Sequence, residues 1–271
     1  MSVSSILDQT FKMLSLASEL SLVAANSLSV AMETNGQGFL GFIVELPGAF
    51  VRGPVEDEAL SKAHHEAGSY LRWLGHEQTR FPKAHVVQTH RCRLMVEDAD
   101  CEILLDNDTR EMDDQEFRRL ADLAKLSGVT FNKLFDSVEL RDWIDEAKIR
   151  RTFYGQNKKT IQEIFDHVKQ TQYYYLSRTS TSIIADQSEH FMRIRNFSLD
   201  ALEALFRQNG NLKVYTVDNE AWTLKKILRR FIWHDRIHGK AITRILEKQR
   251  QLGLIDRYDD PFRFDVGSKR Q

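Results

Sequence analysis

Residues 222–252 read WTLKKILRRFIWHDRIHGKAITRILEKQRQL and form one long stretch of helical spacing. Its apolar residues recur at the spacing of one face of an α-helix; they are Leu224, Leu228, Phe231, Ile242 and Ile245. His238 stands seven residues after Phe231 and seven before Ile245, so we expect it to face inward. His234 lies one turn earlier on nearly the same face. The stretch therefore predicts a long amphipathic helix that turns two imidazoles toward the protein interior.

Three further segments upstream have helical spacing. They cover residues 113–138, the segment that begins at Thr160 and runs through Leu176, and residues 198–208. Thr160-Ile161-Gln162-Glu163 has the pattern of a capping box, which opens a helix. His167 follows Ile164 by about one turn and borders the inward face of that helix. Four amphipathic helices with medium connections predict an all-α four-helix bundle.

His167, His234 and His238 together predict a metal site. A lone histidine on an apolar face is usually a core residue, but two buried imidazoles cost free energy unless each finds a partner. Three histidines from two facing helices can give one divalent ion three nitrogen ligands and leave a position open, as in catalytic sites. The open position would activate a water or a thiol. No carboxylate stands out as a general base, so the catalytic group beyond the metal stays unassigned.

The front of the chain has a different character. Residues 27–51 alternate between apolar and polar side chains and contain Asn35-Gly36-Gln37-Gly38. This pattern predicts two strands joined by a hairpin turn. A second turn follows at Pro47-Gly48, before a third strand at 49–51. Helical spacing covers 56–74, and strand character returns at Val86-Val87 and at 101–105. We therefore expect an α+β lobe over residues 1–107, with an amphipathic helix near its start, and the bundle over 108–271.

Composition narrows the classes of protein that fit. The 271 residues include 38 basic and 39 acidic ones, so nothing indicates nucleic acid or an anionic membrane as a partner. The apolar segment at 14–24 is not preceded by a basic cluster, and no run of about 18 apolar residues occurs, so we expect neither a signal peptide nor a membrane span. Cys92 and Cys101 form no CxxC pair, which favours the reducing cytoplasm over a disulfide framework or a thiolate zinc site.

Two motifs resemble the DinB-like (DinB/YfiT-type) metal-binding bundle proteins. Residues 160–168, TIQEIFDHV, followed by Tyr174-Tyr175-Leu176, resemble the helix that presents the first metal histidine of that family. Residues 232–242, IWHDRIHGKAI, resemble its last-helix motif, His-x-x-x-His followed by Arg/Gly-x-x-Ile. The resemblance spans roughly residues 111–252 and makes His167, His234 and His238 the metal ligands. Ile237 departs from the pattern, because the family often has a histidine directly before the last ligand.

The DinB-like resemblance implies a cofactor and a class of chemistry. The ion would be divalent, with zinc or nickel most frequent, in a bundle that is often a homodimer. Relatives include transferases and isomerases that use low-molecular-weight thiols, although no thiol-binding residue can be carried over to this sequence.

The front lobe resembles HicB-like domains. Residues 35–53, NGQGFLGFIVELPGAFVRG, followed by Glu58-Ala59-Leu60, match the corner of a small sheet that precedes a helix in that family. The resemblance covers about residues 27–75. In antitoxin relatives this fold binds a toxin or a ligand, but no contact residue can be named here. We expect a scaffold or regulatory lobe.

Two functions remain open at this point. The first is a metal-dependent hydrolase or thiol transferase acting on a small molecule. The second is a non-enzymatic binding or regulatory module, with a structural metal or none, whose HicB-like lobe receives a partner. A closed structural site would need a fourth protein ligand, for which Asp235 and Glu163 are candidates.

The remaining histidines and basic pairs have a plainer interpretation. The histidines outside the predicted site are expected at the surface; they are His64, His65, His76, His85, His90 and His190. The basic pairs are expected on the wet face of their helices; they are Lys158-Lys159, Lys225-Lys226 and Arg229-Arg230. For Tyr173-Tyr174-Tyr175, packing is favoured over a place at a pocket mouth.

Overall fold

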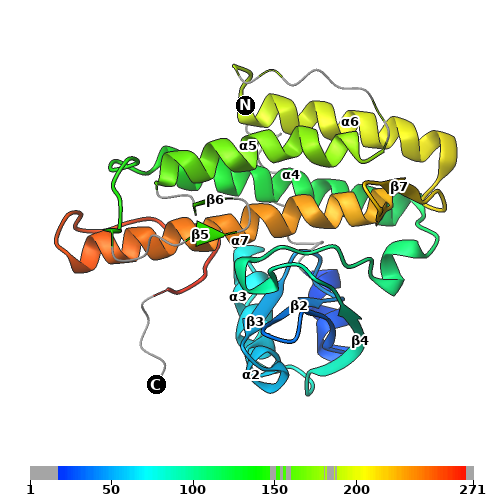
Figure 1. Cartoon of the computed structure of the whole chain (residues 1–271). Coiled ribbons are helices and arrows are strands. Elements are labelled where there is room, and N and C mark those ends of the chain that lie inside the picture. Colours follow the sequence, from blue (N-terminus) through cyan, green and yellow to red (C-terminus); the bar gives the residue numbers. More distant parts are fainter. Residues whose placement is uncertain are drawn as a thin grey trace. The chain divides into compact units, whose positions relative to one another are not determined.

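The computed structural model describes residues 18–146, 151–152, 155–156, 160–179, 181, 186 and 188–266 (Figure 1). The chain divides into two compact units, and its architecture is a mixture of α-helices and β-strands. The first unit extends to Cys101 and also contains Phe262–Asp265, while the second comprises Glu102–Pro261 and the residues from Val266. The sequence placed the boundary after residue 107, whereas the second unit begins at Glu102.

The first unit is built on a four-stranded sheet. Its strands are β1 (Ser29–Thr34), β2 (Phe39–Ile43), β3 (Phe50–Gly53) and β4 (His85–Arg91), in the order β3-β2-β1-β4. The predicted hairpin is confirmed: β1 and β2 pair antiparallel, and the Asn35 Oδ1 accepts the backbone N–H of Gln37 at 2.9 Å in the turn between them. β3 pairs antiparallel with β2, and β4 pairs parallel with β1.

The helical segment predicted over residues 56–74 is two helices, α2 (Glu56–Ser61) and α3 (Ala63–Trp73). They are separated at Lys62, whose backbone N–H bonds to the carbonyl of Ala59, three residues back, instead of continuing the four-residue ladder. The predicted apolar face is buried along α3, and the hydroxyl of its Tyr70 donates to the carbonyl of Pro47 at 2.9 Å. Residues 18–26 are helical as well, while residues 14–17 lie outside the described part of the chain.

The strand predicted at residues 101–105 was wrong. The segment alternates buried and half-buried residues, as a strand would, but it belongs to none of the sheets in the described part of the chain. Side chains of the second unit take its carbonyls instead. The Lys226 ammonium donates to the carbonyl of Glu102 at 2.7 Å, and the Arg229 guanidinium donates to that of Ile103 at 3.4 Å. These bonds satisfy backbone groups that a strand would satisfy within a sheet.

Most of the second unit consists of long helices (Figure 1). They are α4 (Asp114–Asp136), α5 (Ile161–Ser177), α6 (Phe191–Asn209) and α7 (Leu224–Gln251). The helices α4 and α5 each pack against both α6 and α7. All four were predicted, although α6 begins seven residues before the predicted start at 198. None of the helices in the described ranges combines the length and apolar character that crossing a membrane requires.

Short elements and caps fix where these helices begin. The 3-10 turns η1 (Val96–Asp98) and η2 (Asp106–Thr109) precede α4, and the hairpins β5 (Arg151–Thr152) with β6 (Gly155–Gln156) and β7 (Tyr215–Val217) with β8 (Glu220–Trp222) precede α5 and α7. The predicted capping box at Thr160 is confirmed, with its hydroxyl accepting the N–H of Glu163 at 3.0 Å. Thr223 caps α7 in the same way through the N–H of Lys226.

The basic residues that begin α7 are buried, which corrects the prediction that they form a wet face. Lys225, Lys226, Arg229 and Arg230 are each at most 7% exposed. The Lys226 ammonium bonds to the Glu220 carboxylate at 2.8 Å, and Arg229 pairs with the buried Asp108. Desolvation lowers the pKa of Lys226. Lys158-Lys159 lies outside the described residues.

The C-terminal end of α7 makes stability depend on pH. The Glu247 carboxylate accepts hydrogen bonds from Arg250 at 2.8 and 2.9 Å and from Gln251 and Tyr258, and the Arg250 bonds above all lower its pKa to about 2. Because this pKa lies below the ordinary 4.5, the ionised group stabilises the fold at neutral pH, and that stabilisation is lost as the pH falls from 4.5 toward 2.

We expect Glu247→Gln to lower the free energy of unfolding at pH 7 by roughly 1–2 kcal/mol, because the variant loses the charged acceptor of these hydrogen bonds. The loss is no larger than this because Arg250 is partly exposed and solvent screens the pair. The difference from wild type should shrink as the pH approaches 2. Urea unfolding of both proteins at pH 7, 4 and 2.5 measures it. Glu111→Gln, which removes an exposed carboxylate, controls for lost surface charge. A Glu247→Gln deficit that stays constant with pH would contradict the assignment.

Candidate metal centre

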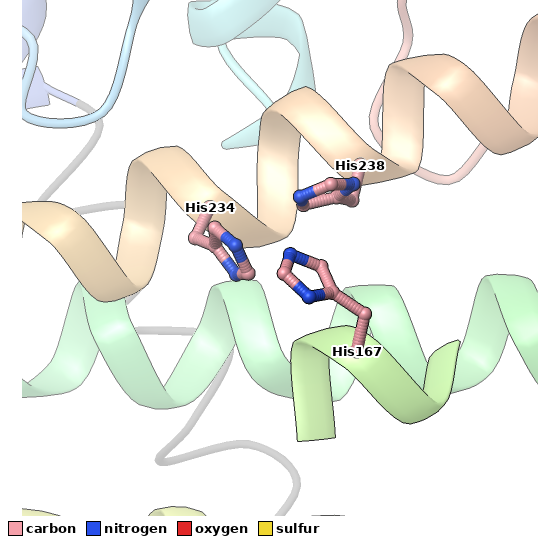
Figure 2. Close-up of side chains that lie close together, drawn as sticks. All are labelled: His167, His234 and His238. Carbon is pink, nitrogen blue, oxygen red and sulfur yellow. The ribbon is translucent and has the colours of Figure 1, made fainter. Parts of the chain in front are cut away.

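The three histidines predicted as ligands lie together in the second unit. Helix α5 carries His167, and α7 carries His234 and His238 one turn apart (Figure 2). The ring centroids are 5.0 Å apart for His167 and His234, 4.8 Å for His167 and His238, and 4.4 Å for His234 and His238. One nitrogen of each ring lies within 4.8 Å of the other two. The three side chains therefore form one cluster that could hold a metal ion.

Local sequence explains why the cluster forms. The capping box at Thr160 sets the start of α5, so that Ile164 and Val168 are buried and His167 falls at the edge of the buried face. On α7, the spacing of four residues puts both histidines on one side of the helix. Packing of α5 against α7 then brings the two sets together.

The cluster is partly open. His234 is buried, at 6% exposed, whereas His167 and His238 are half-buried. Burial lowers the pKa of His234 well below its usual value, and the neighbouring His238, His167, Arg230 and Arg195 add to that effect. His234 is therefore a neutral imidazole at neutral pH, which is the form that binds a metal.

The donor set fits a divalent transition ion. A tetrahedral ion with bonds of about 2.1 Å to nitrogen holds its ligand atoms about 3.4 Å apart, so the ring nitrogens would have to close by about 1.4 Å at most. Three imidazoles suit zinc and nickel, while the hard ions calcium and magnesium prefer oxygen.

Neither candidate for a fourth protein ligand joins the cluster. Glu163 caps the start of its own helix, where its carboxylate accepts the N–H of Thr160 at 3.3 Å. Asp235 is fully buried and paired with Arg195. Within the described ranges, the group of metal-ligating side chains around His234 contains histidines alone. Three protein ligands are the number found in open sites.

Aromatic rings cover the buried side of the cluster. Tyr175 presents its edge to His234 with centroids 5.6 Å apart, and it contacts Phe231 at the same distance. Trp233 lies 6.0 Å from His234. For Tyr175, at 2% exposed, the packing role is confirmed, whereas Tyr174 is exposed. These rings keep water from the His234 side of the cluster.

A buried polar network that we did not predict from the sequence lies next to the cluster. Arg195 of α6 and Asp235 of α7 form an ion pair with both side chains at most 1% exposed. Spacing carried a signal: Asp235 stands seven residues after Leu228 and seven before Ile242, and Arg195 stands four after Phe191. Opposite charges on the apolar faces of two helices indicate a buried pair.

None of the other histidines in the described residues is a member of the cluster. His64, His65, His85 and His190 are exposed, as expected, while His76 and His90 are half-buried. His190 caps α6 by accepting the N–H of Met192 at 3.3 Å, and His76 bonds to the hydroxyl of Ser21 at 2.9 Å. Hydrogen bonding thus accounts for both.

Comparison with known proteins adds no relative from which a function could be transferred. No family model matches the chain, and neither a curated protein nor a solved structure matches it.

Proposed function

We propose that the second unit is a metal-dependent enzyme of the DinB-like type, in which α4, α5, α6 and α7 form a four-helix bundle. The observation that carries the proposal is the convergence of His167, His234 and His238 from two helices into one partly open cluster. The packing of α4 and α5 against both α6 and α7 supports the bundle. The order of the three histidines along the chain supports the family.

The residues of the cluster would hold one divalent ion, zinc or nickel. Bound there, the ion would supply a Lewis acid that lowers the pKa of a water or of a low-molecular-weight thiol. The imidazoles bring no negative charge, so the site favours an anionic group such as a thiolate as the next ligand. Tyr175 shields His234 from water, while the partial exposure of His167 and His238 leaves a route for the substrate.

The proposed reaction is the transfer of a group to a thiol, or hydrolysis, in which the metal alone activates the nucleophile. Among the described residues, the ligating side chains of the cluster include no carboxylate, so we assign the proton of the nucleophile to no side chain of the cluster. A thiol would lose that proton to solvent. Its sulfur would then form a bond to an electrophilic carbon of a second substrate, while the bond from that carbon to its leaving group breaks and the leaving group departs with the electron pair. With water as the nucleophile, the same arrangement gives hydrolysis.

The first unit has a supporting place in this proposal. Its Pro47-Gly48 turn joins β2 to β3 and is followed by α2, which is the order that the HicB-like resemblance implies. We propose a scaffold or regulatory role for it. The DinB-like resemblance also implies a homodimer, which sedimentation of the purified chain would test.

The experiment uses the full chain, stripped with a chelator and reloaded with zinc or nickel. In one screen, low-molecular-weight thiols are combined with electrophilic acceptors. In a second screen, esters are supplied without any thiol to detect hydrolysis. Mass spectrometry identifies the products of both. We expect turnover that requires the metal and disappears in His238→Ala. If the wild-type protein binds no metal after reloading, the proposal that it is a metal-dependent enzyme is wrong. Unfolding of the helices on metal removal would instead assign a structural ion and the regulatory alternative.

A further inference from the structure

The guanidinium of Arg195 joins the two helices that carry the candidate ligands. Its Nε donates to Gln172 Oε1 of α5 at 2.7 Å. Its Nη1 and Nη2 donate to the two carboxylate oxygens of Asp235 on α7 at 2.8 and 2.9 Å. Arg195 itself belongs to α6, which carries no candidate ligand. The side chain therefore connects α5 to α7 from a third helix.

The fourth helix completes the network. The hydroxyl of Ser127 on α4 donates to Asp235 at 2.6 Å, and Arg195 also donates to the carbonyl of Ala124 on α4. A Cβ at Gly128 would lie 2.9 Å from Nη1 of Arg195, so the glycine leaves the room that the guanidinium occupies. All four helices thus contribute to one buried arrangement.

The network adjoins His234 on α7 and is more than one turn from His167 on α5. Asp235 directly follows His234, and Gln172 follows His167 by five residues, which is about 7.5 Å along the helix axis. The Arg195 guanidinium also lies over the ring of Phe231, at 4.5 Å from the centroid. A change in the Arg195 bonds would therefore be transmitted directly to the separation of His167 from His234.

Stability alone does not explain the network. A buried ion pair is expensive to desolvate, and apolar side chains of similar volume often replace one with no loss of stability. The pair instead fixes the relative position of the helices. The planar Arg195 guanidinium is bonded at three nitrogens to fixed acceptors, so the helices that it joins have little freedom to slide or rotate. Metal affinity depends on that freedom, since residues that orient the ligands typically change it 10- to 100-fold.

We propose that Arg195 is a positioning residue of the metal site, which sets the register of α5 against α7 through Gln172 and Asp235. This inference rests on the proposed function, because it takes the three histidines as ligands of one ion.

The test measures cobalt(II) binding to the metal-free full chain, by affinity and by the visible absorption bands of the bound ion. Arg195→Met combined with Asp235→Leu removes the network without leaving a charge buried alone. Gln172→Met, on α5 and away from His234, removes the Arg195 bond to that helix, together with the bond from Gln172 Nε2 to the carbonyl of Phe191 at 3.3 Å. We expect cobalt affinity 10- to 100-fold weaker in the double variant, a smaller loss in Gln172→Met, and altered absorption bands in both.

The matched control is the buried pair of Arg229 and Asp108, which ties α7 to η2 instead of to α5. Arg229→Met combined with Asp108→Asn should bind cobalt with wild-type affinity and wild-type bands. Wild-type affinity and bands in Gln172→Met and in a folded double variant would overturn the positioning role alone. A wild type that binds no cobalt would overturn the metal site, and the positioning role with it.

Discussion

His167→Ala and His238→Ala are expected to abolish stoichiometric metal binding while the protein stays folded. The metal-free wild type should take up one zinc or nickel ion, and each variant should bind it at least about 100-fold more weakly, since it loses a direct ligand. Both side chains are half-buried, so truncation opens little cavity, and alanine is the best helix former. Elemental analysis after gel filtration gives the stoichiometry, and competition with a chromophoric chelator gives the affinity.

The control for this prediction is His85→Ala, which removes an exposed imidazole from β4 of the first unit. It should bind metal as the wild type does. Circular dichroism of all the variants checks that α5 and α7 remain helical. Undiminished metal uptake by His238→Ala would show that the cluster is not the binding site. His234→Ala is less clean, because its side chain is buried and its truncation leaves a cavity.

Periodicity predicted the parts of the site that depend on one helix at a time. Phe231 and Ile245 fixed the direction of His238, and the capping box fixed the start of α5 and therefore the place of His167. The pairing of α5 with α7 was an inference from bundle geometry, and the two helices do pack together. Local patterns thus sufficed to predict the three histidines of the cluster, since the place of each is set by its own helix.

Periodicity failed where burial depends on partners from elsewhere in the chain. Lys226 and Arg229 look like a solvated face, yet Glu220 and Asp108 lie against them. Those carboxylates come from a short hairpin and a 3-10 turn, where no periodic signal exists. The same two basic residues take the carbonyls of 102 and 103 and so remove the strand that alternation predicted there. A pattern within one segment cannot register such partners.

Asp235→Ala is expected to cause the largest loss of stability of any change considered for this chain. It leaves the buried Arg195 guanidinium without its counter-charge. It also removes one acceptor of the Ser127 hydroxyl, which keeps its bond to the carbonyl of Ala124 at 3.1 Å. Breaking one side of a buried pair costs about 3–5 kcal/mol, which is a large part of the stability of an ordinary domain. Urea unfolding of the metal-free protein measures the loss without a contribution from a bound ion.

The double variant Arg195→Met with Asp235→Leu shows whether the loss in Asp235→Ala comes from the unpaired charge of Arg195 or from the lost hydrogen bonds. Because it buries no lone charge, we expect it to unfold at nearly the wild-type urea concentration even though it lacks every bond of the pair. Asp114→Ala, which breaks the exposed pair with Arg207, should change the midpoint little. Equal losses in Asp235→Ala and in the double variant would show that the hydrogen bonds themselves hold the helices. A small loss in Asp235→Ala would show that water reaches Arg195.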